Sequence, residues 1–179
     1  MQNSKLDIFD SNTTIDINEK FLIKPIIEEF IDQEALLYEH NCRTSGVKEQ
    51  FPEFYAADQL EAKERLLHFI GKAKKRESIL YCIRFKDFLA PIGYIYLGAP
   101  QNKNDNWQAK VWVNGSMQKK GIMSNALKSL VPLLHNFDIS CLEYSVPRLH
   151  DSGQKIFEKI GFKLVNQDNG MNNYHYTVE

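Results

Sequence analysis

The chain has 179 residues, of which 43% are hydrophobic and 25% charged, and its net charge is −1 with a pI near 6.5. This size and composition are typical of one globular domain, and the near-neutral charge argues against a surface that binds nucleic acid throughout. The N-terminus lacks the features of a signal peptide and no apolar run approaches the roughly 18 residues that span a bilayer, so we expect a cytoplasmic protein that binds neither nucleic acid nor a membrane.

Hydrophobic periodicity divides the chain into helices and strands without a repeat or a linker. The resulting order is β-α-α-β-β-β-α-β-α-β-β, typical of an α+β or mixed α/β domain around one sheet. In chain order, the expected elements are a strand at 21–26, helices at 27–40 and 57–74, strands at 78–85, 90–97 and 107–113, a helix at 122–134, a strand at 141–146, a helix at 152–160 and strands at 162–165 and 174–178.

Two segments lie outside these elements. Residues 1–18 are polar and predict a loose arm or a short edge strand. Residues 41–55 are irregular, and the aromatic side chains of Phe51, Phe54 and Tyr55 are expected to be exposed, as in loops that line substrate pockets. Together with the last strand, which could pair at its edge, these aromatics would allow a homodimer.

The cysteines carry no sign of a disulfide framework or a metal site. Cys42, Cys82 and Cys141 are widely spaced and odd in number, which indicates free thiols in a reducing compartment. The chain has no Cys-x-x-Cys pair, and its histidines are scattered. We therefore expect no bound metal.

The segment 118–127 is the most informative part of the chain. A strand-like run ends just before it, and an amphipathic helix begins inside it. The first N–H groups of a helix have no intrahelical partner, and the helix dipole adds partial positive charge at the same place. Lys119 and Lys120 add to this field, while Gly121 allows the backbone to approach a phosphate closely. The segment therefore predicts a pyrophosphate-binding corner.

The pattern Gln118-x-x-Gly121-x-Met123 resembles the acetyl-CoA loop of the GCN5-related N-acetyltransferases (GNAT), and Gly-Ile-Met-Ser is most similar to their RimJ/RimL branch. The helix ending at 158–162, Glu-Lys-Ile-Gly-Phe, is similar to that family's closing helix, and the resemblance extends over about 21–178. It implies one GNAT-like domain over 1–179, with a twisted mixed sheet of about six or seven strands flanked by about four helices.

The resemblance also implies a cofactor and a reaction. The cofactor is acetyl-CoA, and the acceptor is a primary amine, either at a protein N-terminus, for example of a ribosomal protein, or on a small molecule. Main-chain groups of Trp112 and Val113 would bond to the pantetheine arm. The pyrophosphate would be held by Gln118, Lys119, Lys120, Gly121, Ile122, Met123 and Ser124.

The proton-transfer residues of the family are less well matched. The family's strand glutamate falls on Gln108, which is no base at neutral pH, and the tyrosine that more distant relatives use as an acid falls on Phe157. The asparagine that opens the last helix falls on His150, with Ser152 close by. An imidazole titrates at about pH 6.5, so His150 either transfers a proton or only caps the helix or touches the cofactor.

Glu143 is the remaining candidate base, acting through water, and the alternative for it is a solvent-facing strand residue. We take His150, Glu143 and Ser152 as the candidate catalytic residues. The substitutions in the family pattern also motivate a different function, that of a non-catalytic acyl-CoA-binding module. Both functions predict coenzyme A binding, but only the enzyme releases free thiol when an amine is present.

Overall fold

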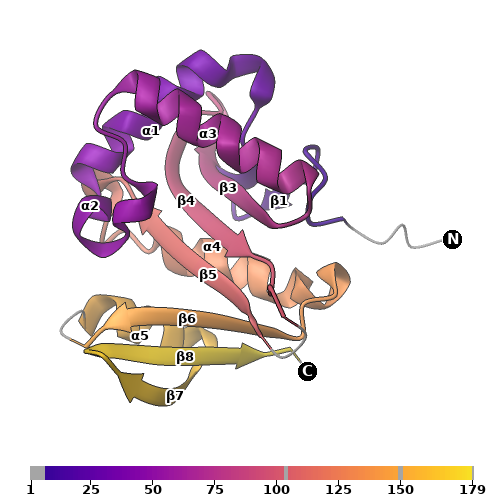
Figure 1. The fold of residues 1–179 in the computed structure, drawn as a ribbon, viewed down its shortest axis with the longest axis vertical. Coiled ribbons are helices and arrows are strands. Elements are labelled where there is room, and N and C mark those ends of the chain that lie inside the picture. The colour runs from indigo at the N-terminus through magenta and orange to yellow at the C-terminus, as the bar shows by residue number, and fades with distance from the viewer. Residues whose placement is uncertain (1–6, 103–104, 149–150, 179) are drawn as a thin grey trace, which may run out of the picture.

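The computed structural model describes residues 7–102, 105–148 and 151–178, with the side chains of 151 and 152 outside that description (Figure 1). These residues form one eight-stranded sheet in the order β1-β2-β3-β4-β5-β6-β8-β7. The strands are β1 (Ile15–Asp16), β2 (Phe21–Pro25), β3 (Ser78–Phe85), β4 (Pro91–Gly98), β5 (Trp107–Val113), β6 (Cys141–Pro147), β7 (Lys163–Asp168) and β8 (Met171–Thr177). The α-helices are α1 (Ile31–Thr44), α2 (Val47–Gln50), α3 (Gln59–Lys74), α4 (Ile122–Leu130) and α5 (Asp151–Ile160).

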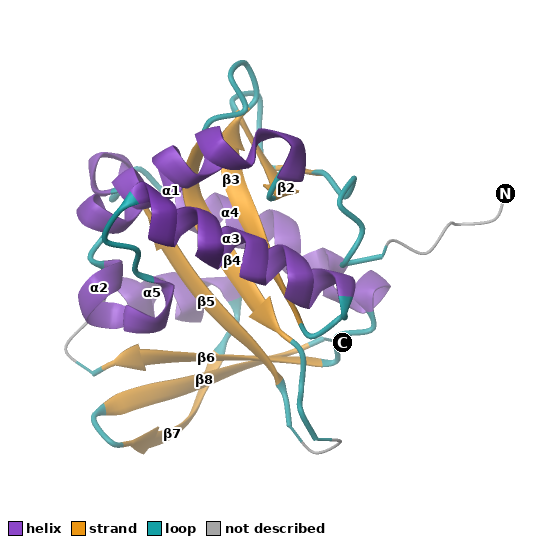
Figure 2. Cartoon of the chain, turned by 45° about the horizontal axis from the view of Figure 1, so that its top comes forward, coloured by secondary structure: helices purple, strands orange, loops and turns teal. Residues whose placement is uncertain are grey.

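Helices cover both faces of the sheet. Figure 2 shows α1 and α3 on the face turned toward the viewer, with α4 and α5 behind. Because successive strand side chains point to opposite faces, β5 contributes to two apolar cores. Ala109, Val111 and Val113 belong to the core beside α4, whereas Trp112 packs with Tyr94 in the core beneath α1 and α3.

The sheet changes direction between β5 and β6, which are its parallel pair. β1 to β5 are joined antiparallel to one another, and β6, β8 and β7 are joined antiparallel in turn. β5 and β6 are paired only from Trp107 opposite Leu142 to Ala109 opposite Tyr144. Beyond this short register the two strands diverge toward the side of the molecule where α2 lies (Figure 1).

The predicted mixed α/β architecture is confirmed: the described part of the chain has eight strands where six or seven were expected and five α-helices where four were expected. The additional helix is α2, inside the segment predicted to be irregular. The helix predicted at 122–134 ends as an α-helix at Leu130 and continues as a 3-10 helix, Val131–Phe137. Pro132 explains this change, because it has no N–H to continue the α-helical ladder.

The N-terminal segment packs onto the sheet as far as the structure describes it. β1 pairs with β2, and Ile8 is buried in the core. The hydroxyl of Tyr81 on β3 donates a hydrogen bond of 2.6 Å to the carbonyl oxygen of Ile8. Residues 7–18 are therefore attached to the sheet and do not form a loose arm.

Two expectations that supported a homodimer are wrong. The last strand, β8, lies between β6 and β7, so both of its edges are occupied and the edge strand is β7. Phe51 and Phe54 are buried in the core beneath α1 and α3, and Tyr55 is half-buried against it. Across the described residues, no helix is both long and apolar enough to cross a membrane.

Candidate active site

A cleft of about 410 Å³ opens where β5 and β6 separate. Crevices beyond the carboxyl ends of parallel strands are favoured places for ligands, because the strands leave backbone groups unpaired there. The cleft is lined by Thr44, Ser45, Gly46, Gln50, Val111, Trp112, Val113, Met117, Gln118, Lys119, Gly121, Ile122, Met123, Ser124, Tyr144, Gly153, Ile156 and Phe157.

The start of α4 opens into this cleft. Gly121 immediately precedes the helix with φ of 73°, in the left-handed region that favours glycine. Lys119 also has a left-handed backbone, with φ of 60°. The first α-helical bond runs from the N–H of Asn125 to the carbonyl oxygen of Gly121, and among the described residues no side chain caps the preceding N–H groups. An anion in the cleft would meet these donors and the positive end of the helix dipole.

The nine residues predicted to bind the cofactor are almost all brought together. Lys120 is the exception, since it does not line the cleft and its Nζ lies 3.8 Å from the sulfur of Met117. Among the described residues, Lys119 alone supplies a cationic side chain to the lining. The eight that line the cleft are Trp112, Val113, Gln118, Lys119, Gly121, Ile122, Met123 and Ser124.

Side-chain hydrogen bonds fix the loop between β5 and α4. The amide nitrogen of Gln118 donates to the carbonyl oxygens of Ser45 and Val113, at 3.2 and 3.3 Å. The buried side chain of Asn114 donates to Oδ1 of Asn41 on α1 at 2.7 Å. The loop is therefore held in place before any ligand binds, which lowers the entropic cost of binding.

Sequence reasoning missed the wall opposite this loop, which comes from the end of α1 and from α2. Its members are Thr44, Ser45, Gly46 and Gln50. Gly46 was the sequence signal that could have indicated this wall, but residues 41–55 were predicted to be an irregular loop of the kind that lines a substrate pocket. Among the described residues, the hydroxyl of Ser45 has no hydrogen-bond partner although the residue is only 5% exposed. A buried hydroxyl without a partner is costly.

An aromatic stack lines part of the cleft. The rings of Tyr144 on β6 and Phe157 on α5 are stacked with centroids 3.6 Å apart, and both residues line the cleft. Burial raises the pKa of Tyr144 above its ordinary value. A phenol with a raised pKa is a weaker acid, so Tyr144 is suited to shaping the cleft and poorly suited to protonating a leaving thiolate.

Of the three candidate catalytic residues, the structure describes the side chain of Glu143. His150 lies outside the described residues, and Ser152 lies in α5 with its side chain outside the description. Glu143 lies on β6, on the sheet face opposite the core that contains Tyr144. Its carboxylate is 3.5 Å from Nε2 of His175. Among the described residues, no three His, Cys, Asp or Glu side chains gather as a metal site requires.

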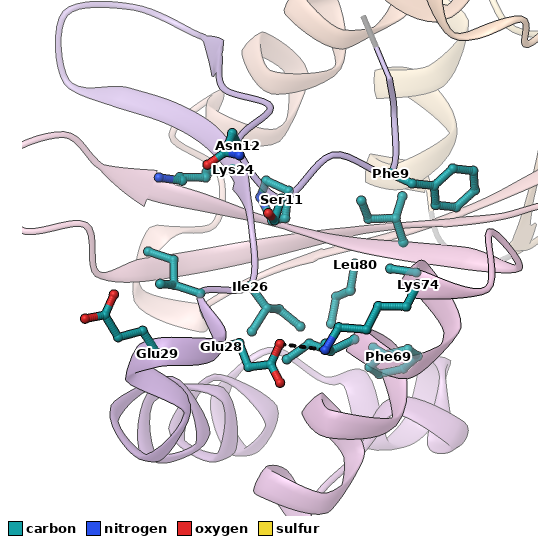
Figure 3. A pocket seen from close by; sticks show the side chains of 15 residues that line it. Phe9, Ser11, Asn12, Lys24, Ile26, Glu28, Glu29, Phe69, Lys74 and Leu80 are labelled. Carbon is teal, nitrogen blue, oxygen red and sulfur yellow. Dashed lines mark hydrogen bonds and ion pairs between the residues drawn. The ribbon is translucent and has the colours of Figure 1, made fainter.

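A second cavity, of about 420 Å³, lies between the N-terminal segment, β2 and α3 (Figure 3). Two cationic and two anionic side chains line it, Lys24 and Lys74 with Glu28 and Glu29, and Lys74 forms an ion pair of 2.9 Å with Glu28. The described residues that line this cavity carry no excess of positive charge, and the cavity lies away from the divergent strands. The cleft at α4 is therefore the better candidate for a phosphate-bearing cofactor.

Comparison with protein families shows which family the chain belongs to. Residues 27–177 match the family model described as the acetyltransferase (GNAT) domain. The chain belongs to the GNAT family. The match covers the cleft, both of its walls and the strands beside them, so this protein has a GNAT acetyltransferase domain with the family's core architecture.

Solved GNAT structures share the fold at low sequence identity. RimL, the ribosomal L7/L12 alpha-N-protein acetyltransferase in complex with coenzyme A, superposes with a TM-score of 0.78 at 17% identity, over 93% of this chain and 98% of that chain. An acetyltransferase from Salmonella typhimurium that modifies the N-terminal serine of L7/L12 gives 0.75 at 16%, over 93% and 100%. The microcin C7 self-immunity acetyltransferase MccE, with acetyl-CoA and AMP, gives 0.74 at 15%, over 96% and 100%. No curated protein sequence gives a significant match.

Proposed function

We propose that this GNAT protein transfers the acetyl group of acetyl-CoA to a primary amine. The observation that carries the proposal is the coincidence of two features in one cleft: the uncapped start of α4, and the edge that β5 exposes where it leaves β6. The first suits a pyrophosphate, and the second suits an extended chain that bonds to a strand edge. Coenzyme A has both parts in one molecule.

Each wall has a part in this proposal. The N–H groups at the start of α4, with Lys119, would hold the pyrophosphate, and the main chain of Trp112 and Val113 would bond to the pantetheine arm. Bound acetyl-CoA supplies a thioester carbonyl that an amine can attack. The chain's own task is to hold that carbonyl at the separation of β5 and β6 and to accept protons from the amine.

Two classes of acceptor follow for testing. Both RimL and the Salmonella typhimurium relative act on the N-terminus of ribosomal protein L7/L12. A peptide with a free N-terminal serine is therefore the first acceptor to test, with small-molecule amines as the second. The competing function is a module that binds acyl-CoA without turnover. A thiol-release assay with these acceptors tests it as well, because such a module would release no free thiol.

The Gly121→Leu variant tests the proposed cofactor site. We expect it to bind acetyl-CoA at least about tenfold more weakly, because a side chain at the start of α4 would occupy the space of the phosphate oxygens. In the protein alone, a Cβ at Gly121 meets no atom within 4 Å. Calorimetric titration with acetyl-CoA measures binding, and thiol release with the serine peptide and an amine panel measures turnover.

Gly170→Leu is the matched control. Gly170 has φ of 76°, and a Cβ there likewise meets no atom within 4 Å, so the backbone strain is the same, about 1–2 kcal/mol. Gly170 lies in the turn between β7 and β8, away from the cleft. Equal affinity losses in both variants would contradict the proposed cofactor site. Tight acetyl-CoA binding by the wild type with no thiol release on any amine would favour the non-catalytic module.

A further inference from the structure

Four strands on the face opposite the α4 core carry a row of polar residues at one level of the sheet. Gln108 on β5 lies beside Glu143 on β6, Glu143 beside His175 on β8, and His175 beside Lys163 on the edge strand β7. Gly98 continues the row on β4, as the register partner of Gln108. Partners at one level point to the same face, so their side chains are neighbours.

Glu143 and His175 form a cross-strand pair within this row. Oε2 of Glu143 and Nε2 of His175 are 3.5 Å apart, and the two side chains are 27% and 29% exposed. They are therefore sheltered on the sheet and still reachable by a small group. The pair combines a carboxylate with an imidazole, two side chains that serve as proton acceptors in catalysis.

Glu143 borders two cavities on this face. The larger, of about 510 Å³, is lined by Glu143 together with Gly98 and Gln108, and the smaller, of about 160 Å³, is lined by Glu143 together with Ser145 and Lys110. Gly98 and Tyr96 also line the larger cavity, and a Cβ at Gly98 would lie 3.0 Å from the Tyr96 hydroxyl. Glu143 is the carboxylate shared by both cavities.

The smaller cavity adjoins the cofactor cleft. Gln50 on α2 lines both of them. Glu143 also lies one residue before Tyr144, where the pairing of β5 and β6 ends. An acceptor amine that approaches over Glu143 therefore comes from the sheet face covered by α1 and α3 and reaches the place where β5 and β6 separate. The loop before α4 lies at the cofactor cleft.

We infer that Glu143 receives the proton of the acceptor amine and that His175 positions Glu143 and takes that proton from it. This inference rests on the proposed function. In the step, an ammonium group gives one proton to the pair, its nitrogen forms the N–C bond to the thioester carbonyl carbon, and the C–S bond breaks with its electron pair going to sulfur. The nitrogen then loses a second proton, and the coenzyme A sulfur gains one, which leaves an amide, a free thiol and one proton.

Glu143 needs His175 as a partner because a carboxylate by itself is a weak base at neutral pH. An imidazole next to it fixes its orientation and stores the proton. The other titratable or charged groups near the row are Cys141 on β6, Lys163 on β7, Lys110 on β5, which is paired with Glu53, the Tyr96 hydroxyl on β4 and Asp105 in the loop before β5. Within that set, the histidine is the side chain whose ring nitrogens can both accept and donate a proton.

The test is kcat measured against pH with saturating acetyl-CoA and a turned-over amine, for the wild type, Glu143→Gln, His175→Gln and His175→Ala. We expect Glu143→Gln to lower kcat about 100-fold while the acetyl-CoA Kd is unchanged. In the wild type, kcat should fall as pH falls, because an imidazole that already carries a proton cannot take another. His175→Gln should be slower and should lose this acidic limb, and added imidazole should restore part of the activity of His175→Ala.

Glu158→Gln is the matched control. Glu158 on α5 accepts a 3.0 Å hydrogen bond from Tyr174, which lies on β8 next to His175 and points to the opposite face of the sheet. It should keep the wild-type kcat and pH profile. Wild-type rates and profiles in Glu143→Gln and in both His175 variants would overturn this inference and leave the proposed function intact. A wild type that binds acetyl-CoA without turning over any amine would overturn the proposed function and this inference with it.

Discussion

The Gly115→Ala variant is expected to lose about 3 kcal/mol of unfolding free energy, at the upper end of the cost of overpacking, and much of its acetyl-CoA affinity. Gly115 begins the short 3-10 helix Gly115–Met117, between β5 and the cofactor loop. A Cβ there would overlap the carbonyl oxygen of Thr44, the last residue of α1. Backbone atoms move less readily than the end of a side chain, and the Asn41–Asn114 hydrogen bond already holds the two segments together.

The affinity loss follows from the position of the overlap. Thr44 and Ser45 form one wall of the cleft, and the Gln118 side chain on the loop donates to the carbonyl oxygen of Ser45. Forcing α1 away from the loop therefore widens the cleft and breaks that hydrogen bond. Urea unfolding gives the stability change, and calorimetric titration with acetyl-CoA gives the affinity change.

Gly71→Ala provides the matched control with the opposite expected sign. Gly71 lies inside α3, where a Cβ meets no atom within 4 Å. Alanine there should stabilise the protein by about 0.5–1 kcal/mol, because it restricts the unfolded chain and suits a helix. If Gly115→Ala and Gly71→Ala changed stability alike, close packing of the loop against α1 would not be what Gly115 provides.

Local sequence signals were sufficient for most elements and for one wall of the cleft. A strand-like apolar run predicted 78–85, and alternation of apolar residues predicted 107–113, with the bounds that β3 and β5 have. The glycine that ends the strand-to-helix corner predicted the start of α4 at Ile122. Both signals depend on residues that are neighbours in the chain, which is why they can be seen without a structure.

The rest of the site depends on contacts between distant segments. Nothing local reveals that β8 inserts between β6 and β7, and that order is what places His175 beside Glu143. The aromatic residues Phe51 and Phe54 follow a glycine and flank a proline, which resembles an exposed loop, yet both side chains are buried against Trp112. The opposite cleft wall was missed for the same reason, since α2 is a single turn whose position depends on that aromatic cluster.

The Arg84→Leu variant is expected to lose about 3–5 kcal/mol of unfolding free energy at neutral pH, because it leaves a buried carboxylate without its partner. Nη2 of Arg84 on β3 is 2.6 Å from Oε1 of Glu34 on α1, and the side chains are only 1% and 5% exposed. Arg84 also donates to the carbonyl oxygens of Leu89 and Pro25, at 2.8 and 3.2 Å. The pair joins the sheet to the helix whose far end forms the cleft wall.

The effect of pH distinguishes a lost ion pair from lost packing. Burial raises the pKa of Glu34 even with the Arg84 guanidinium beside it. A carboxyl group whose pKa is higher in the folded state binds its proton more tightly when folded, so its contribution to stability is greatest at low pH and is lost as pH rises through the folded pKa. Arg84→Leu removes the charge that lowers this pKa, so the pKa of Glu34 is raised further in the variant. The variant therefore gains more stability than the wild type from protonation of Glu34, and its deficit should shrink as pH falls from 7 toward 5. The double variant Arg84→Leu/Glu34→Leu should recover most of the lost stability at neutral pH, because no uncompensated charge remains.

Urea unfolding of the wild type, the single variant and the double variant at both pH values measures these differences. A deficit that is independent of pH and persists in the double variant would mean that packing, and not the charge pair, holds α1 to the sheet.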